Sequence, residues 1–284
     1  MRILVTGAAG TLGRAVMSVG TSHDLLGVDL VDGDLTSANA VDHLFARHDP
    51  DWVVHCAAYT DVDGAESDRE TARRVNGEAT TNLIKCCDRD DVGLTFVSTD
   101  YVFAGKNPDG YGERDLRDPV NHYGSTKAAA EQAVEAMTAP GQIVRTSWLF
   151  GPGSSNFVLT IRRLLGSRPS IRVVDDQRGC PTYAPDLAGV LLFLAENGTP
   201  GHFHGTNSGA CSWFEFARAV ALADGWPSDV IQPCSSQEYP TPARRPACSI
   251  LRSETLEALG CAPRPTWEDA LDRYLNLLRV EESR

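Results

Sequence analysis

The sequence is short of positive charge and has no long hydrophobic run. Its 26 lysines and arginines face 38 aspartates and glutamates, which gives a formal net charge of −12 over 284 residues. Nucleic acids and anionic membranes both select basic surfaces, so neither is expected as the main partner. No stretch reaches the roughly 18 consecutive apolar residues of a membrane span. The N-terminal MRILVTGAAG also lacks the apolar core of a signal peptide, so we expect a cytoplasmic protein.

Metal-binding patterns are missing as well. The eight cysteines include no C-x-x-C pair, and neither they nor the seven histidines show zinc-ligand spacing. We therefore expect reduced and mostly buried thiols. With 42% hydrophobic and 23% charged residues, the composition is that of an ordinary globular protein with one large domain or two lobes.

Between residue 1 and about 146, short β-branched apolar runs alternate with longer segments of helical spacing. The expected strands are 2–6, 25–28, 51–56, 94–98 and 142–146, and the expected helices are 11–19, 37–48, 67–89 and 123–137. This alternation is typical of right-handed βαβ units, whose parallel sheet is covered by helices on both faces. We predict an α/β fold with a Rossmann-like, doubly wound parallel sheet over residues 1–150.

After residue 150, proline and glycine interrupt the pattern. Helical spacing remains at 156–166, 185–196, 212–224, 254–259 and 267–279, with short strands expected at 171–174 and 202–206. We predict a smaller, mixed α/β substrate-binding lobe over most of 151–284. The helix at 185–196 is apolar nearly all round, so we expect 173–200 to return to the large sheet.

Three glycines follow the first expected strand and open the first expected helix, in the sequence GAAGTLG. A dinucleotide pyrophosphate needs a tight turn, close backbone approach and free amides at a helix N-terminus, and glycines there supply all three. The alternative, a glycine turn without a ligand, is disfavoured by this position directly after the strand. The predicted cofactor contacts of the loop are Gly7, Ala9, Gly10, Thr11, Leu12 and Gly13.

Asp29 ends the second expected strand, 22 residues after Gly7. A carboxylate at this place binds the ribose of adenosine and repels a 2′-phosphate, so among NAD(P)H cofactors NADH is slightly favoured. Arg14, next to the last glycine, could still accommodate a phosphate. Asp34 and Leu35 are expected at the adenine, with a helix N-cap as the alternative.

Tyr123 and Lys127 lie four residues apart, on one face of an expected helix. A cation beside a phenol favours the phenolate, so we expect the pair to act as an acid and base near neutral pH. Thr99 follows the fourth strand at the carboxyl edge of the sheet, where its hydroxyl can polarise a carbonyl. Thr99, Tyr123 and Lys127 are the predicted catalytic residues of hydride transfer at a carbonyl carbon.

With these residues in place, the chain resembles the extended short-chain dehydrogenase/reductase superfamily and, within it, the dTDP-4-dehydrorhamnose reductase family. Besides the glycine loop, the resemblance rests on HCAAYTDVDGAE (55–66), Val75–Asn76, STDYVF (98–103), YGSTK (123–127), VRTSWLFG (144–151), VVDDQRGCPTYAPDLA (173–188), GTNSGACSWFEFA (205–217) and ARRPACSIL (243–251). It implies NAD(P)H-dependent reduction of the 4-keto group of a nucleotide-linked 6-deoxyhexose, foremost dTDP-4-dehydro-L-rhamnose to dTDP-L-rhamnose.

The resemblance also implies roles for single residues. Tyr123 would protonate the sugar 4-oxygen, Lys127 would bind the cofactor ribose, and Thr99 would polarise the carbonyl. Further implied cofactor contacts are Ala57, Ala58 and Tyr59. The implied substrate contacts are Val62, Asp100, Tyr101, Phe103, Trp148, Asn156 and Arg244. For Arg244, a cation for the nucleotide diphosphate, a solvated turn is the alternative.

Three further expectations follow from the resemblance. Some members of this family hold a metal between subunits with acidic side chains that start on the first helix; the stretch LGRAVMSVG (12–20) carries none, so no metal is expected. A homodimer is expected. The substrate could also be another nucleotide-linked ketosugar, or the protein could be a non-catalytic dinucleotide-binding regulatory subunit, against which the complete set of Thr99, Tyr123 and Lys127 argues.

Overall fold

A six-stranded parallel sheet forms the centre of the larger lobe. The computed structural model describes residues 1–19 and 22–283. The strands are β1 (Arg2–Thr6), β2 (Asp24–Val28), β3 (Trp52–His55), β4 (Gly93–Thr99), β5 (Gly141–Thr146) and β10 (Gly201–His204). Their order is β10-β5-β4-β3-β1-β2, and every pair is parallel. The order reverses at β1, which pairs with β2 on one side and β3 on the other, and a crevice opens at such a switch point.

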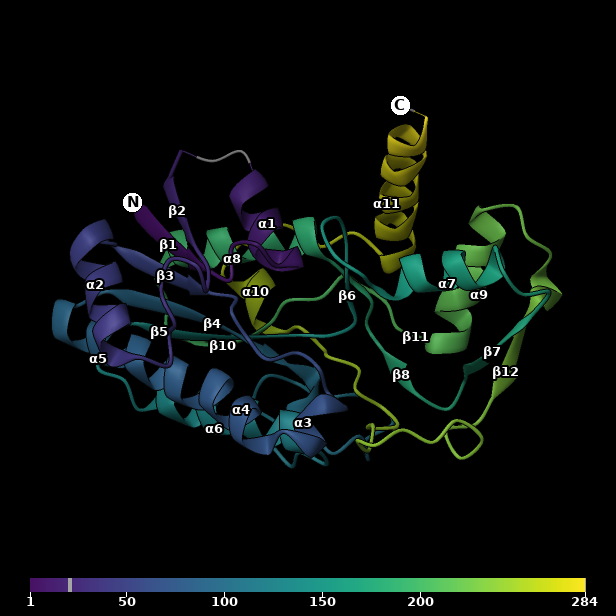
Figure 1. Ribbon diagram of the computed structural model, residues 1–284, viewed down its shortest axis with the longest axis horizontal. Coiled ribbons are helices and arrows are strands. Elements are labelled where there is room, and N and C mark those ends of the chain that lie inside the picture. Colours follow the sequence, from purple (N-terminus) through teal and green to yellow (C-terminus); the bar gives the residue numbers. More distant parts are fainter. Residues whose placement is uncertain (20–21, 284) are drawn as a thin grey trace.

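Alternate strand residues supply the two faces of the sheet. In β1, Ile3 and Val5 pack in a core with helices on one face, whereas Leu4 packs in a second core on the other face. The helices are α1 (Thr11–Ser18) and α8 (Ala184–Asn197) on the first face, and α2 (Ala38–His48), α5 (Ala79–Asp90) and α6 (His122–Glu135) on the second (Figure 1). The predicted doubly wound, Rossmann-like sheet is confirmed.

The single helix expected over 67–89 is divided in the structure. The segments are α3 (Gly64–Ser67), α4 (Arg69–Arg73), a π-helical turn (Arg74–Glu78) and α5. The π turn carries the buried Asn76, whose side chain accepts a hydrogen bond from the Tyr59 amide and donates one to the Thr126 hydroxyl. The irregular turn thus joins the loop after β3 to α6.

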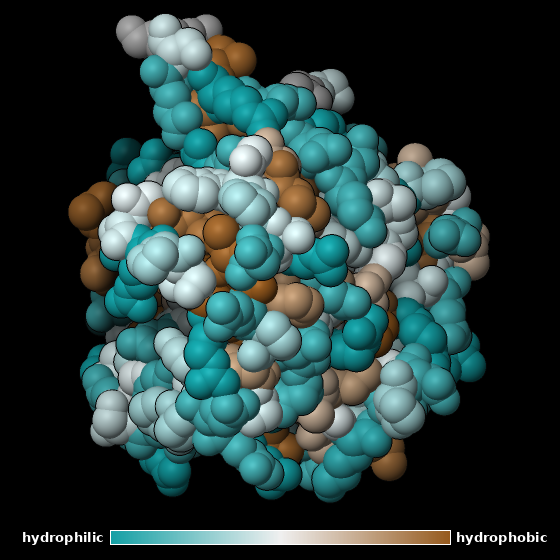
Figure 2. Space-filling model, turned by 90° about the vertical axis from the view of Figure 1, so that its right-hand side faces the viewer, coloured by the Kyte–Doolittle hydropathy of each residue, from teal (hydrophilic) through white to brown (hydrophobic). Residues whose placement is uncertain are grey.

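The smaller lobe is built from helices and three two-stranded sheets, β11-β8, β12-β7 and β6-β9. Its elements are β6 (Leu149–Phe150), α7 (Phe157–Leu165), β7 (Ile171–Val174), β8 (Arg178–Gly179), β9 (Thr182–Tyr183), β11 (Cys211–Ser212), α9 (Trp213–Ala223), β12 (Ile231–Cys234) and α11 (Trp267–Glu282). They share an aromatic-rich core that includes Phe150, Phe216 and Tyr274. On the face seen in Figure 2, hydrophobic residues are interspersed among hydrophilic ones.

The chain returns to the large sheet later than expected. Residues 171–174 form β7 and pair with β12 in the smaller lobe, so the return begins with α8 rather than at residue 173. It continues through β10, which pairs with β5 at the sheet edge, although 202–206 was expected in the smaller lobe. Further along, α10 (Thr255–Ala258) contributes the buried Leu256 to the core beneath α8. Strand length alone does not say which sheet a strand joins.

Two general features of the described residues bear on the site. No helix among them combines the length and apolar character needed to cross a membrane. Within residues 1–19 and 22–283, no three histidine, cysteine, aspartate or glutamate side chains gather as ligands for a metal ion.

Candidate functional site

A cavity of about 810 Å³ lies along the carboxyl ends of the strands. It extends from the glycine loop after β1 to the ends of β4 and β5 and to α9 of the smaller lobe. The predicted residues that line it are Gly7, Ala9, Gly10, Thr11, Leu12, Gly13, Asp29, Asp34, Leu35, Ala57, Ala58, Val62, Thr99, Asp100, Tyr101, Tyr123, Lys127 and Trp148. The structure therefore brings most of the predicted residues to one cavity.

The glycine loop leaves no room for side chains. Gly7 has φ +66°, and a Cβ on Gly7 would lie 2.8 Å from the backbone of Ala57. A Cβ on Gly13 would lie 2.1 Å from the Gly7 carbonyl oxygen. The N-cap of α1, Gly10, makes no side-chain cap, and the first turn of the helix has no acidic residue. The backbone amides at this end of α1 therefore line the cavity at a place suited to a phosphate group.

Asp29 is held in place at the end of β2. Its carboxylate accepts hydrogen bonds from the amides of Ala9, at 2.9 Å, and Leu30, at 2.8 Å. The guanidinium of Arg14 donates to the Ala9 carbonyl at 2.6 Å. A negative and a positive group thus lie close to the same end of the glycine loop.

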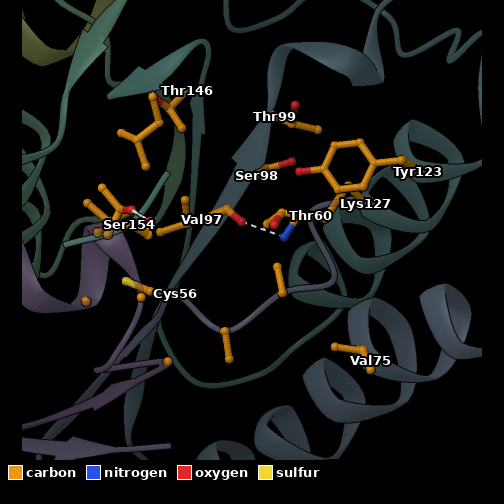
Figure 3. Close-up of a pocket in the computed structure, with 18 of the residues that line it drawn as sticks. Cys56, Thr60, Val75, Val97, Ser98, Thr99, Tyr123, Lys127, Thr146 and Ser154 are labelled. Atoms are coloured by element: carbon orange, nitrogen blue, oxygen red, sulfur yellow. Dashed lines mark hydrogen bonds between the residues drawn. The ribbon is translucent and has the colours of Figure 1, made fainter. Parts of the chain in front are cut away.

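Tyr123 from α6 and Thr99 from the end of β4 lie near each other in the wall of the cavity (Figure 3). Burial, reinforced by the nearby Asp100, raises the pKa of Tyr123 to about 12, although a hydrogen bond with Thr99 opposes this. This raised pKa favours the protonated phenol over the phenolate. Tyr123 is protonated at neutral pH, as a proton donor has to be.

Lys127 lies almost fully buried, at 2% exposure, one turn after Tyr123 on α6. Its ammonium donates to the Val97 carbonyl at 2.6 Å (Figure 3). The same ammonium lies 4.0 Å from the centre of the Phe96 ring. Burial lowers the pKa of Lys127 to about 7, and the charge of Glu131 opposes that effect. Lys127 is thus poised near neutrality.

In the part of the chain that the structure describes, two buried polar atoms of the cavity wall lack a hydrogen-bond partner. They are Oδ2 of Asp100 and Oγ1 of Thr146. Asp100 is 3% exposed, and burial raises its pKa to about 7 while hydrogen bonds from Ser249 and Thr99 oppose the rise. Buried polar atoms without partners are uncommon, so both suit a polar ligand.

An aromatic pair closes the cavity on the side of the smaller lobe. The rings of Trp148 and Trp213 stack with their centres 3.6 Å apart. Trp148 has φ +48°, a left-handed conformation that a bulky residue seldom adopts. A Cβ on Gly179 would lie 2.5 Å from an atom of the Trp148 indole, so a glycine at this position leaves space for the stacked pair.

Four predicted residues do not line the cavity. Phe103 is buried and stacks on the Tyr111 ring at 4.3 Å. Asn156 caps α7 and donates to the Tyr274 hydroxyl. Tyr59 has its backbone held by Asn76 and also lies outside the lining residues.

The fourth is Arg244, whose side chain is exposed and whose carbonyl accepts from the side chain of Asn121, the N-cap of α6. The next residue, Arg245, is the partly buried one: it pairs with Asp63 and hydrogen-bonds to Tyr101. Sequence spacing could not tell which of the two neighbouring arginines faces inward.

Several lining residues were not predicted. They are Val28, Leu30, Gly33, Thr36, Cys56, Thr60, Val75, Ala79, Val97, Ser98, Thr146, Ser147, Leu149, Ser154, Ser155 and Trp213. Ser98 and Ser147 directly adjoin predicted residues, and Thr146 ends β5, so strand ends were the available signal. Ser154 hydrogen-bonds to Thr11 across 143 residues of sequence, which no local pattern indicates.

The fold and the cavity define a class: a parallel α/β dinucleotide-binding fold with the Tyr-x-x-x-Lys pair of short-chain dehydrogenases and reductases. Residues 1–280 match the family model described as the RmlD substrate binding domain, and the chain belongs to this family.

Relatives of known name support this assignment. A dTDP-4-dehydrorhamnose reductase of Mycolicibacterium smegmatis is 41% identical over 95% of this chain and 84% of its own length. A dTDP-4-keto-6-deoxy-D-glucose reductase of Streptomyces niveus is 36% identical over 99% of both chains. The crystal structure of dTDP-4-dehydrorhamnose reductase from Bacillus anthracis in complex with NADP has a TM-score of 0.93 and 36% identity, over 96% of this chain and 98% of that one.

Proposed function

We propose that this protein is an NAD(P)H-dependent reductase of the 4-keto group of a nucleotide-linked 6-deoxyhexose, with dTDP-4-dehydro-L-rhamnose as its substrate and dTDP-L-rhamnose as the product. The observation that carries the proposal is the position of Thr99, Tyr123 and Lys127 on one wall of a cavity whose far end is the glycine loop. The similarity to named reductases over almost the whole chain supports it.

The glycine loop and Asp29 fit a dinucleotide, because the loop has no room for side chains and Asp29 is fixed at its edge. When bound, NAD(P)H supplies the hydride. Gly10 to Gly13 would hold its pyrophosphate, Asp29 its adenosine ribose, and Lys127 its second ribose.

Each polar side chain of the site has its own role in this reaction. The Thr99 hydroxyl orients the ketone through a hydrogen bond, and the Tyr123 hydroxyl gives its proton to the ketone oxygen. The high pKa of Tyr123, about 12, keeps that proton in place until charge develops on the oxygen. Trp148 and Trp213 exclude water from the side of the smaller lobe.

Within this proposal NADH is slightly favoured over NADPH, since the carboxylate of Asp29 repels a 2′-phosphate. Arg14 lies near the same end of the loop and limits that preference. Cytoplasmic location is also part of the proposal, because all eight cysteines are unpaired, as thiols are in a reducing compartment. The homodimer stays a prediction.

A second candidate keeps the chemistry and changes the sugar. The relative from Streptomyces niveus is named for a different dTDP-linked 4-ketosugar, and its 36% identity over nearly the full length supports this candidate. The two candidates differ only in the stereochemistry that the cavity accepts.

The deciding experiment follows the absorbance of NADH and NADPH while the dTDP-4-keto-6-deoxy sugar is made in situ by preceding enzymes of the pathway. We expect oxidation that depends on the sugar, and the ratio of the two rates tests Asp29. Oxidation with only the D-gluco ketosugar would support the second candidate. No oxidation, by protein that binds dinucleotide, would leave a regulatory subunit as the better description.

A further inference from the structure

Behind the cavity wall lies a chain of buried charges that the proposed reaction does not use. Glu131 is 0% exposed and Arg145 is 1% exposed. The guanidinium of Arg145 donates two hydrogen bonds to the carboxylate of Glu131, at 2.9 Å and 2.7 Å. Ser98, whose neighbour is Thr99, donates to the same carboxylate at 2.6 Å. The pair thus reaches the cavity wall through one hydroxyl.

The location of Glu131 relative to Lys127 is the second observation. Both belong to α6 and are four residues apart, which places them on the same helix face. Both are buried, and among the described residues the direct partners of the Lys127 ammonium are a carbonyl oxygen and an aromatic ring. Burial drives an ammonium to lose its proton, and a nearby negative charge opposes this loss.

The groups that face Lys127 from the end of β3 and the residue after it do not supply this negative charge. Burial lowers the pKa of His55 to about 3, so its imidazole is neutral. Burial also raises the pKa of Cys56 to about 12, so its sulfur is a neutral thiol. Tyr123, on α6, is protonated as well. Glu131 remains as the negative group acting on Lys127.

The surroundings of Glu131 keep it charged. Burial disfavours its anion, but the hydrogen bonds and charge of Arg145, assisted by Ser98 and Arg117, outweigh this and lower the pKa of Glu131. From β10, His202 and His204 face Arg145 and have pKa values lowered by burial.

Two acidic groups complete these surroundings. Glu135 holds the far side of Arg117 at 2.8 Å. The backbone carbonyl of Glu113 accepts from Arg145 at 3.1 Å, and its carboxylate accepts from the amides of Glu254 and Thr255.

We propose that Glu131 is the buried counter-ion of Lys127, a positioning residue that keeps the ammonium charged at the cavity wall, and that Arg145 holds Glu131 in this role. The inference rests on the proposed function for its consequence in catalysis. Its physical content, a charge interaction inside the unloaded protein, does not depend on which sugar is reduced.

The composition of the chain allows a direct test. It has three lysines, Lys85, Lys106 and Lys127, and the first two are exposed. Protein labelled with ¹³C at lysine Cε therefore gives three signals, and the spectrum of Lys127→Arg identifies the buried one. Titration of the unloaded protein then gives the protonation midpoint of Lys127 without any assay of activity.

We expect the midpoint of Lys127 to lie near pH 7 in the natural sequence and to fall by at least about one pH unit in Glu131→Gln. Glu131→Asp retains the charge and should recover most of the shift. Glu135→Gln is the matched control, since it removes a charge one turn further along α6. In this variant the protonation midpoint of Lys127 should not move. An unchanged midpoint in folded Glu131→Gln would overturn the proposal.

Glu131→Gln leaves Arg145 buried without its partner, so the variant could fail to fold. The double variant Glu131→Gln/Arg145→Met removes both charges and keeps the side-chain volumes similar. The same fall in the Lys127 midpoint is expected in the double variant; a midpoint equal to that of the natural sequence would refute the counter-ion role.

Dinucleotide binding gives the link to catalysis. Fluorescence titration of NADPH across pH 6–9 should show binding weaken at a lower pH in Glu131→Gln than in Glu135→Gln. If neither protein binds dinucleotide, the proposed function fails and the lysine titration still decides the role of Glu131.

Discussion

At the scale of single residues, the chemistry of the site depends on the protonation states that burial sets. Tyr123 keeps its proton because its surroundings oppose the phenolate. For Tyr123→Phe we expect turnover to fall about 10²–10⁴-fold, while the dinucleotide still binds. Steady-state rates and NADPH fluorescence measure the two effects, and a fully active variant would contradict the assignment.

Asp100 makes the stability of the protein depend on pH. Its pKa is about 7 in the fold, against an ordinary value near 3.8, so between these pH values the folded protein binds a proton that the unfolded chain does not. The stabilisation is complete below about pH 4 and is lost as the pH rises through 7. Asp100→Asn removes this dependence, and at pH 8 the variant should be more stable than the natural sequence, by at most about 4 kcal/mol.

Urea unfolding from pH 4 to 8 measures the Asp100 effect as the difference between variant and natural protein. Asp109→Asn, which removes a carboxylate from an exposed loop, is the control for the substitution itself. A difference between Asp100→Asn and the natural protein that does not change with pH would show that Asp100 is ionised at little cost in the fold.

At the scale of elements, the glycine loop and α8 give opposite expectations for the same substitution. In Gly13→Ala the new methyl group would meet the Gly7 carbonyl oxygen, so the loop has to open and dinucleotide affinity should fall at least about tenfold. In Gly189→Ala, within α8, nothing lies within 4 Å of the new Cβ, and we expect stabilisation by about 0.4–1 kcal/mol. Thermal unfolding and NADPH titration of both variants measure these effects. If Gly13→Ala bound NADPH as tightly as the natural protein, the glycine loop would not be the dinucleotide-binding site.

Sequence patterns predicted the elements whose signal is local. The apolar run of β1, followed at once by Gly7, Gly10 and Gly13, predicts a strand, a turn and a helix without distant information. The π turn at Arg74–Glu78 was missed, because its cause is the tertiary hydrogen bonding of Asn76 to Tyr59 and Thr126. The same holds for Trp213, which reaches the cavity only because its helix packs beside Trp148.

At the scale of the whole molecule, a helix far along the chain completes the core of the larger lobe. Leu191 of α8 is fully buried against the sheet, although it lies far along the chain from β1. Leu191→Ala should lower the free energy of unfolding by about 2–5 kcal/mol. Leu222→Ala, at a half-exposed leucine of α9, is the matched control and should change it by less than about 0.5 kcal/mol. Urea denaturation decides, and equal effects would mean that α8 adds little to the core.

The late return of the chain also governs the order of events during protein synthesis. The sheet gains its edge strand only when Gly201–His204 has been made, and Leu256 completes the core under α8 later still. Until then, a growing chain on the ribosome carries an uncovered apolar sheet face and an unpaired β5 edge, both of which favour aggregation. Nascent chains of this protein should therefore depend on chaperones until nearly the whole polypeptide has been translated, even though the first β-α-β unit is complete within its first 28 residues.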